Sequence, residues 1–182
     1  MSDTVGYAVV GLGVGRNHAR AAARAKNCRL VAVCDIDRPK ADAVAAELDC
    51  LAIYDLDELL TRSDVDIVSI CTPSGMHSDM IVKAAAAGKH ILCEKPLDIK
   101  LEKVDAALEA CRKHAVKLGG IFQNRLAPAN KAIKEAISSG ALGRTYLGNM
   151  QVKWWRSQEY YDTGGWRGTW AMDGGGSLMN QS

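Results

Sequence analysis

A lysine held between an acid and a proline, in Cys93-Glu94-Lys95-Pro96, is the residue best suited to do chemistry. The apolar residues 91–93 come directly before it and predict a buried strand. Lys95 therefore emerges at the carboxyl end of a strand, where open α/β sheets place their ligands. Pro96 restricts its own φ and allows a cis peptide bond before it, which would aim Lys95 sharply. A surface turn that happens to contain a lysine is the alternative.

A glycine-rich loop, Gly11-Leu12-Gly13-Val14-Gly15, follows the first apolar run and opens a helical segment. In a dinucleotide-binding loop the first glycine permits a tight turn, and the second lets the backbone approach a pyrophosphate. The helix that follows supplies amide donors and the positive end of its dipole. The third glycine comes one residue earlier than in Gly-x-Gly-x-x-Gly, so the fit is imperfect. We expect Gly11, Gly13, Val14 and Gly15 to contact a dinucleotide.

Asp35 follows the second apolar run directly. A carboxylate at this place accepts hydrogen bonds from ribose hydroxyls and would repel a 2′-phosphate. The pattern therefore favours NAD over NADP. Arg38 is near enough to weaken that preference, and Arg16 could contact phosphate. A turn or helix-capping aspartate is the alternative interpretation of Asp35.

A third turn begins with Thr72 and Pro73 and runs to His77, after the fourth apolar run. Because it falls on the same edge as the glycine loop, we expect Thr72, Pro73 and His77 to line the cofactor edge. His77 would meet the ribose or the nicotinamide; a capping turn with a surface histidine is the alternative. His18, on the first helix, is expected to be packed or exposed rather than catalytic.

These motifs need a frame that brings their turns together. Short apolar runs alternate with helical segments of about ten residues, which predicts an α/β fold with a doubly wound parallel sheet. Right-handed crossovers then bring the carboxyl ends of all strands to one edge. The expected strands cover residues 5–10, 30–34, 52–54, 67–71, 90–93 and 117–122. The expected helices cover residues 17–26, 39–48, 76–87 and 101–114, with a further helix capped by Asp55 and Glu58.

The character of the sequence changes near Phe122. A helix is predicted over residues 128–138 and a long strand over residues 145–156, and all four tryptophans lie between positions 154 and 170. We therefore predict a dinucleotide-binding domain in residues 1–122. Residues 123–182 begin a C-terminal substrate and oligomerisation domain, which is expected to be truncated before its sheet is complete.

The composition narrows the functional classes. A net charge of +2, with Lys and Arg scattered along the chain, argues against a nucleic-acid partner. Apolar runs too short for a membrane span argue against a membrane protein, and a start without signal-peptide features predicts a cytoplasmic location. The six cysteines form no Cys-x-x-Cys pair, so they predict structural thiols in a reducing compartment and no metal site.

Taken together, the motifs resemble those of the Gfo/Idh/MocA oxidoreductases, relatives of glucose–fructose oxidoreductase and inositol dehydrogenase. The likeness spans nearly the whole chain; its most specific part is Glu94-Lys95-Pro96, whereas the glycine loop is shared with many folds. Segments at residues 122–125, 140–144, 166–170 and 173–181 also look like this family, especially its nucleotide-sugar 3-dehydrogenase branch. The motifs that carry the resemblance are Gly11-x-Gly13-x-Gly15-x-x-His18, Asp35, Thr72-Pro73-x-x-x-His77 and Glu94-Lys95-Pro96.

This resemblance implies a Rossmann domain followed by a mixed α/β domain with a mostly antiparallel sheet. It implies hydride transfer between nicotinamide and a hydroxyl-bearing carbon of a sugar, nucleotide sugar or cyclic polyol. Lys95 would contact the reacting hydroxyl, stabilise developing alkoxide charge and orient the C–H bond. Glu94 and Pro96 would lie with Lys95 in the cofactor-binding set.

The likeness also suggests a polar substrate contact by Asn180, and contacts with substrate or cofactor by Arg125, Trp166 and Arg167. For the last three, a buried aromatic or a structural salt bridge is an equal alternative. An acid–base histidine is expected a few residues beyond Gln181, and the sequence ends before that position. A truncated, non-catalytic NAD-binding module is therefore the alternative function, and a structural subunit completed by another chain is a third. Unpaired edges at residues 145–156 predict a homo-oligomer, a dimer or tetramer.

Overall fold

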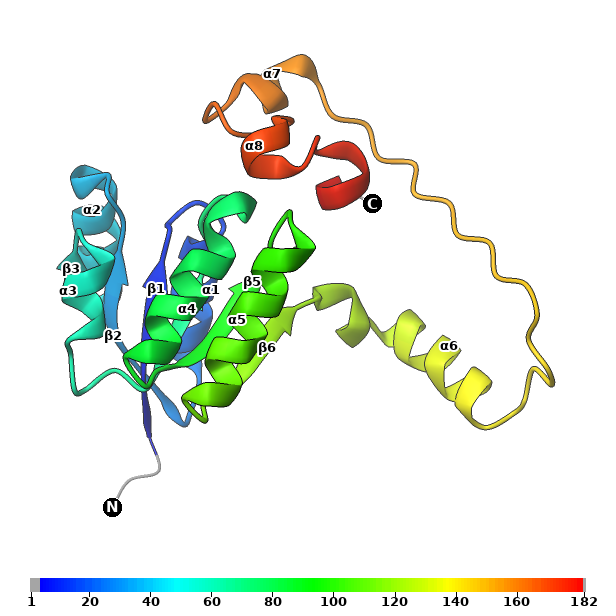
Figure 1. The fold of residues 1–182 in the computed structure, drawn as a ribbon, viewed down its shortest axis with the longest axis horizontal. Helices are drawn as coiled ribbons and strands as arrows, with labels where there is room; N and C mark the ends of the chain where they lie inside the picture. Colours follow the sequence, from blue (N-terminus) through cyan, green and yellow to red (C-terminus); the bar gives the residue numbers. More distant parts are fainter. Residues whose placement is uncertain (1–3, 182) are drawn as a thin grey trace.

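The first part of the molecule is a six-stranded parallel sheet in a computed structural model that describes residues 4–181. Its strand order is β3-β2-β1-β4-β5-β6 (Figure 1), so strands are added in one direction from β1 to β3 and in the other from β4 to β6, while all strands stay parallel. This is the order of a doubly wound dinucleotide-binding sheet, which confirms the predicted fold class. The strands are β1 Val5–Val10, β2 Cys28–Cys34, β3 Leu51–Ile53, β4 Ile67–Ile70, β5 His90–Glu94 and β6 Leu118–Ile121.

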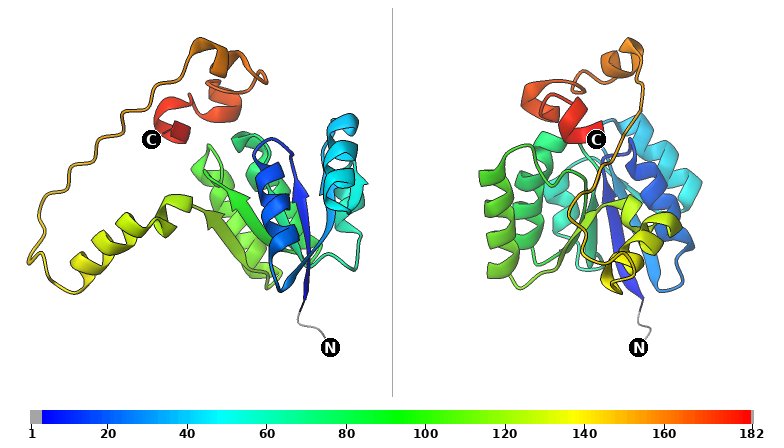
Figure 2. Two further views of the ribbon diagram at one scale, coloured as in Figure 1. Left: turned by 180° about the vertical axis from the view of Figure 1, so that it is seen from behind. Right: turned by 90° about the vertical axis from the view of Figure 1, so that its right-hand side faces the viewer.

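Helices cover both faces of this sheet. In Figure 1, α4 and α5 lie in front of the strands and α1 lies behind them; the reversed view in Figure 2 brings α1 forward. The start of α3 follows the predicted chemistry, since Asp55 accepts a hydrogen bond from the Glu58 amide, and Asp37 caps α2 in the same way by accepting from the Lys40 amide. The helices are α1 Gly15–Arg24, α2 Arg38–Leu48, α3 Leu56–Leu60, α4 His77–Ala86 and α5 Leu101–Lys113, with a 3₁₀ turn η1 at Ser74–Met76.

Two apolar cores hold the sheet between its helices. One includes Val68, Ile70 and Ile81, and the other includes Val9 and Val33; all five are essentially inaccessible to solvent. All six cysteines are unpaired. Burial raises the pKa of the Cys34 thiol to about 12, so this side chain acts as a small apolar residue rather than a nucleophile.

Beyond Phe122 the chain adopts a different kind of structure. The 3₁₀ turn η2 (Gln123–Leu126) leads into α6 (Pro128–Ser138), whose predicted bounds are confirmed. The strand predicted over residues 145–156 is wrong: the segment is extended but lies at a distance from the sheet, leading from α6 back towards the strand ends, and forms no strand in the region described (Figure 1). A strand exists only with a partner for its backbone groups, and residues 122–181 contain no strand of the expected antiparallel sheet.

The last part of the chain returns to the sheet. Helices α7 (Gln158–Asp162) and α8 (Trp170–Asp173) and the π-helical turn η3 (Ser177–Gln181) lie beyond the carboxyl ends of the strands in all three views (Figures 1 and 2). Contact with η1 is close, since a Cβ on Gly75 would lie 2.8 Å from the carbonyl oxygen of Ala171. None of the helices within residues 4–181 is long and apolar enough to cross a membrane.

Candidate active site

Three turns meet at one edge of the sheet, after β1, β4 and β5. Strands β1 and β4 are neighbours whose connections run in opposite directions, and this switch point is where open α/β sheets bind ligands. The glycine loop, the Thr72 turn and the Lys95 turn therefore share the position that the sequence predicted for them. Among the described residues, no group of three His, Cys, Asp or Glu side chains is placed to hold a metal ion.

The glycine loop has the shape that a dinucleotide requires. Gly11 has φ of 85°, and a Cβ there would lie 2.8 Å from the Cys71 carbonyl group. A Cβ on Gly13 would meet nothing within 4 Å, so its backbone is open to approach. At Gly15 a Cβ would lie 2.9 Å from Val9 Cγ1, so this glycine allows α1 to pack closely on β1. The loop fits a pyrophosphate despite its shortened spacing.

Asp35 is the first residue after β2 and lies beside this loop. Its Oδ2 accepts a hydrogen bond from the Leu12 amide at 2.8 Å, and its Oδ1 accepts one from the Asp37 amide at 2.9 Å. The carboxylate has further acceptor capacity, which fits the hydroxyls of a ribose and disfavours a phosphate. Lys40 Nζ lies 3.6 Å from Oδ2 and is the nearest cation.

The two arginines near the loop have partners of their own. The Arg38 guanidinium lies 4.4 Å from the centre of the Tyr54 ring, and Arg16 pairs with Glu47 at 2.7 Å. Arg20 also donates a hydrogen bond to Glu47, and Arg20 and Arg16 together lower the pKa of Glu47 to about 2. Neither Arg38 nor Arg16 therefore neutralises the Asp35 carboxylate.

His77 joins two of the three turns. Its ring is buried, with Nδ1 2.7 Å from the Pro96 carbonyl oxygen and Nε2 2.8 Å from the Thr72 carbonyl oxygen. The predicted contact with ribose or nicotinamide does not suit this buried ring. We therefore infer that His77 holds the Thr72 and Pro96 turns at a fixed separation.

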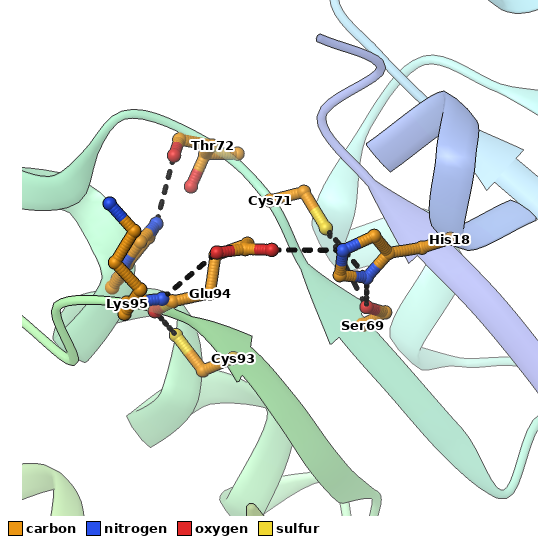
Figure 3. A network of polar contacts seen from close by, with 8 residues as sticks. His18, Ser69, Cys71, Thr72, Cys93, Glu94 and Lys95 are labelled. Atoms are coloured by element: carbon orange, nitrogen blue, oxygen red, sulfur yellow. Dashed lines mark hydrogen bonds and ion pairs between the residues drawn. The ribbon is translucent and has the colours of Figure 1, made fainter. Parts of the chain in front are cut away.

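A second network joins α1 to the turn after β5 (Figure 3). His18 Nε2 lies 2.9 Å from Glu94 Oε1, and His18 Nδ1 lies 3.0 Å from Ser69 Oγ. Glu94 Oε2 accepts a hydrogen bond from the Lys95 amide at 3.1 Å. The ion pair is shielded, because the His18 and Glu94 side chains are only 15% and 13% exposed.

Both members of this pair favour their charged forms. Hydrogen bonds to the Cys71 thiol and to the Glu94 carboxylate raise the pKa of His18 to about 10, against the effect of burial. Burial raises the pKa of Glu94, but its hydrogen bond with His18 reverses this and leaves the pKa below its usual value. The pair therefore fixes the backbone of Lys95 through a charged carboxylate.

The Lys95 side chain reaches the C-terminal segment. Its Nζ donates to the backbone oxygen of Asn180 at 2.6 Å and to Asn180 Oδ1 at 2.7 Å. The Lys95–Pro96 peptide bond is cis. Asn180, predicted as a substrate contact, is thus the residue that meets the predicted catalytic lysine. An ammonium has three N–H donors, so these two bonds leave one for a ligand.

The other predicted substrate residues lie apart from this contact. Arg125 is exposed on η2, and its guanidinium lies 5.5 Å from the centre of the Phe122 ring. Arg167 lies 5.0 Å from the ring centres of both Trp166 and Tyr160. Tyr160 links this cluster to the Lys95 region, because its hydroxyl accepts a hydrogen bond from Gln181 Nε2 at 3.0 Å.

The sequence did not identify three residues as part of the site: Ser69, His18 and Asp173. Ser69 is a fully buried polar residue within the apolar strand β4, which was an available signal. His18 lies one helical turn after Gly15 and so faces the sheet, another available signal. Asp173 is 1% exposed and accepts a hydrogen bond from Asn180 Nδ2 at 2.5 Å. Its place in a glycine-rich turn gave no local indication of that contact.

The family comparisons agree with this geometry. Residues 5–122 match the model described as "Oxidoreductase family, NAD-binding Rossmann fold", and residues 130–182 match the GFO/IDH/MocA C-terminal domain. The chain is 38% identical over 145 residues to inositol 2-dehydrogenase of Rhizobium meliloti, a match that covers 79% of this chain and 44% of that protein. The predicted boundary near residue 122 stays a prediction.

Two solved structures illustrate the range of relatives. The WlbA dehydrogenase of Bordetella pertussis, in complex with NADH and UDP-GlcNAcA, superposes with a TM-score of 0.93 at 33% identity. That match covers 98% of this chain and 55% of the other. The scyllo-inositol dehydrogenase of Lactobacillus casei, with NAD(H) and scyllo-inositol, gives a TM-score of 0.73 at 29% identity, covering 77% of this chain and 42% of the other.

The chain spans about half the length of the relatives it matches. Within that span, the family models cover both the sheet domain and the segment that carries Asn180. The resemblance carried by the glycine loop and Glu94-Lys95-Pro96 is thereby confirmed: the chain belongs to the Gfo/Idh/MocA family of oxidoreductases, whose N-terminal domain is an NAD-binding Rossmann fold.

Proposed function

We propose that this protein is an NAD-dependent dehydrogenase that oxidises a hydroxyl-bearing carbon of a nucleotide sugar, with Lys95 as its catalytic residue. The observation that carries the proposal is the position of Lys95 Nζ. It lies beyond the carboxyl end of β5, one strand from the switch point, and contacts Asn180 of the C-terminal segment. A substrate hydroxyl at this place would lie between the cofactor edge and the second domain.

NAD, when bound, supplies the acceptor for a hydride. Gly11, Gly13 and the amino end of α1 fit its pyrophosphate, and Asp35 fits its adenosine ribose. These residues belong to turns whose shape is set by the sheet and by buried hydrogen bonds.

The ammonium of Lys95 would donate its remaining N–H to the substrate hydroxyl. That bond strengthens as a base takes the hydroxyl proton and negative charge develops on the oxygen, before the carbon gives up its hydride, and a fixed cation that stabilises this charge lowers the barrier. His18 and Glu94 support this role by holding the Lys95 amide, 3.1 Å from Glu94 Oε2. The lysine is therefore fixed at its backbone by the first domain and at its Nζ by the second.

The extent of the structural matches favours a nucleotide sugar over a cyclic polyol. The nucleotide-sugar dehydrogenase matches 98% of this chain, whereas the scyllo-inositol dehydrogenase leaves nearly a quarter unmatched. Arg156 and Arg167 lie over aromatic rings and form no ion pair with an acidic side chain in the described structure. Both guanidinium groups lie over the ring of Tyr160, whose hydroxyl meets Gln181, and two such cations suit a substrate that carries negative charge.

The test is NADH formation by the purified protein with either UDP-GlcNAcA or scyllo-inositol. We expect turnover with the nucleotide sugar and little with the polyol. Turnover with scyllo-inositol alone would reverse the substrate assignment. NAD binding without turnover on any sugar or polyol would favour the non-catalytic NAD-binding module instead.

A further inference from the structure

A carboxylate that has no part in the proposed mechanism is buried behind the Lys95–Asn180 contact. Asp173 is 1% exposed, and each of its oxygens has one hydrogen-bond donor. Oδ1 accepts from Asn180 Nδ2 at 2.5 Å, and Oδ2 accepts from the Gly168 amide at 2.7 Å. It forms no ion pair in the described structure, so its only link to a cation runs through Asn180.

The backbone is shaped to make this arrangement. Gly174, Gly175 and Gly176 follow Asp173 with φ of 61°, 87° and 79°, which turns the chain back on itself. Asn180 then lies opposite Asp173, and the backbone N–H of Asn180 donates a hydrogen bond to the Gly176 carbonyl oxygen at 3.0 Å. A Cβ on Gly176 would lie only 3.0 Å from Asp173 Oδ2, so the space around the carboxylate is tightly filled.

This carboxylate determines which way the Asn180 side chain faces. An amide has an accepting oxygen at one end and a donating nitrogen at the other. Asp173 can only accept when charged, so Nδ2 must face Asp173 and Oδ1 must face Lys95. The opposite orientation would set Nδ2 against the Lys95 ammonium, two donors without an acceptor, and Oδ1 against the carboxylate, two acceptors without a proton.

We propose that Asp173 is a positioning residue for Lys95: it fixes the Asn180 amide so that Oδ1 accepts from the lysine, and it supplies the negative charge that Asn180 itself lacks. This inference concerns the active site put forward above and rests on that function for its catalytic meaning. The contact chain Asp173–Asn180–Lys95 itself can be tested without turnover.

The test measures how fast Lys95 reacts with acetic anhydride near neutral pH, by mass spectrometry of peptides from the labelled 182-residue protein. Exposed Lys100 serves as the internal reference. In Asp173→Asn, one of the two donors must face an NH₂ group, because the new amide has only one accepting oxygen. Asn180 then loses the charged acceptor that fixes its orientation, and Lys95 should react about tenfold faster, the lower end of what is expected for loss of a hydrogen bond to a charged group.

Asp162→Asn is the matched control, since it removes an exposed carboxylate from the same segment. It should leave the Lys95 rate unchanged. Tryptophan emission, to which Trp166 and Trp170 contribute, reports whether the segment stays folded in each variant. Unchanged Lys95 reactivity in Asp173→Asn, with native emission, would overturn the proposal.

A charge swap separates positioning from general stabilisation. In the double variant Asp173→Asn with Asn180→Asp, the new carboxylate at 180 can accept from Lys95 and from the new amide at 173. The oxygen of that amide can still accept from Gly168, so every donor regains an acceptor. We expect reactivity of Lys95 to return to the wild-type rate. A double variant as reactive as Asp173→Asn would contradict the proposal, whereas absent turnover on sugars would count only against the proposed function.

Discussion

The two regions of this molecule are held together in different ways. The apolar clusters that form its cores lie within residues 7–111, where every strand of the sheet has a paired neighbour. Within residues 122–181, only Asp173 and Gly176 are buried. Those two residues lie directly behind the contact between Asn180 and Lys95. The second region is therefore packed most closely at the place where it completes the site, and its other side chains depend little on the first region.

The largest expected difference concerns the stability of the two regions. Leu59→Ala removes a fully buried side chain of α3 from the core and should lower the free energy of unfolding by about 3 kcal/mol. Ile133→Ala in α6, where the side chain is 56% exposed, should change it by less than about 0.5 kcal/mol. Urea unfolding of both variants measures this contrast. Equal losses would show that α6 is packed against a core, contrary to our description.

A smaller effect is expected at the ion pair between His18 and Glu94. His18→Gln should lower the free energy of unfolding by about 2 kcal/mol near pH 6, because Glu94 then loses its charged partner. The pKa of His18 is raised in the folded state, so its stabilisation is complete below its ordinary pKa of 6.5 and disappears as the pH rises towards about 10.

Urea titrations of wild type and His18→Gln at pH 6, 8 and 10 check this pH dependence. The difference between the two proteins should shrink at each step. Stabilisation that grows from pH 6 to pH 10 would mean that His18 is not held in its charged form. The pKa of Glu94 is lowered in the folded state. The stabilisation that Glu94 provides is therefore present above its ordinary pKa and is lost as the pH falls through the lowered pKa.

The next prediction concerns NAD affinity, which should depend on the first region and not on the C-terminal segment. Asp35→Asn should weaken NAD binding about tenfold, because the ribose hydroxyls lose a charged acceptor. The exposed carboxylate of Asp105 on α5 provides the matched control, and Asp105→Asn should leave affinity unchanged. Isothermal titration with NAD and with NADP measures both. Tighter binding of NADP than NAD by the wild type would reverse the predicted cofactor preference.

The smallest effect concerns association of the second region. Trp154 and Trp155 are 64% and 80% exposed, and the extended segment that carries them has no strand partner in the described chain. We predict that the protein self-associates through this surface. Changing both tryptophans to serine should lower the mass found by light scattering, and a monomeric wild type at high concentration would contradict the prediction.

The sheet could be predicted because its signals are local. The apolar run that became β4 and the cap formed by Asp55 are patterns of a few neighbouring residues, and both were found in the structure. Lys95 was placed correctly for the same reason, since it follows an apolar strand directly. Its edge position then follows from the rule for parallel crossovers.

The contacts of the site were harder to predict because they join distant parts of the chain. His18 meets Glu94 across 76 positions, and Lys95 meets Asn180 across 85, so no local pattern records either contact. The strand expected at residues 145–156 failed for a related reason: β-propensity describes one segment, whereas a strand also needs a partner. His77 shows a third limit, since its turn was located correctly but the burial of its ring depends on the Pro96 turn.

Removal of the Lys95 ammonium tests the central claim most directly. In Lys95→Met, we expect NAD affinity, measured by quenching of tryptophan fluorescence, to stay near the wild-type value, because the glycine loop and Asp35 are untouched. Turnover of the nucleotide sugar should fall about 10³-fold, the effect of losing a donor to a developing oxyanion. Lys100→Met, at an exposed position, should alter neither quantity. Retained turnover in Lys95→Met would contradict the account.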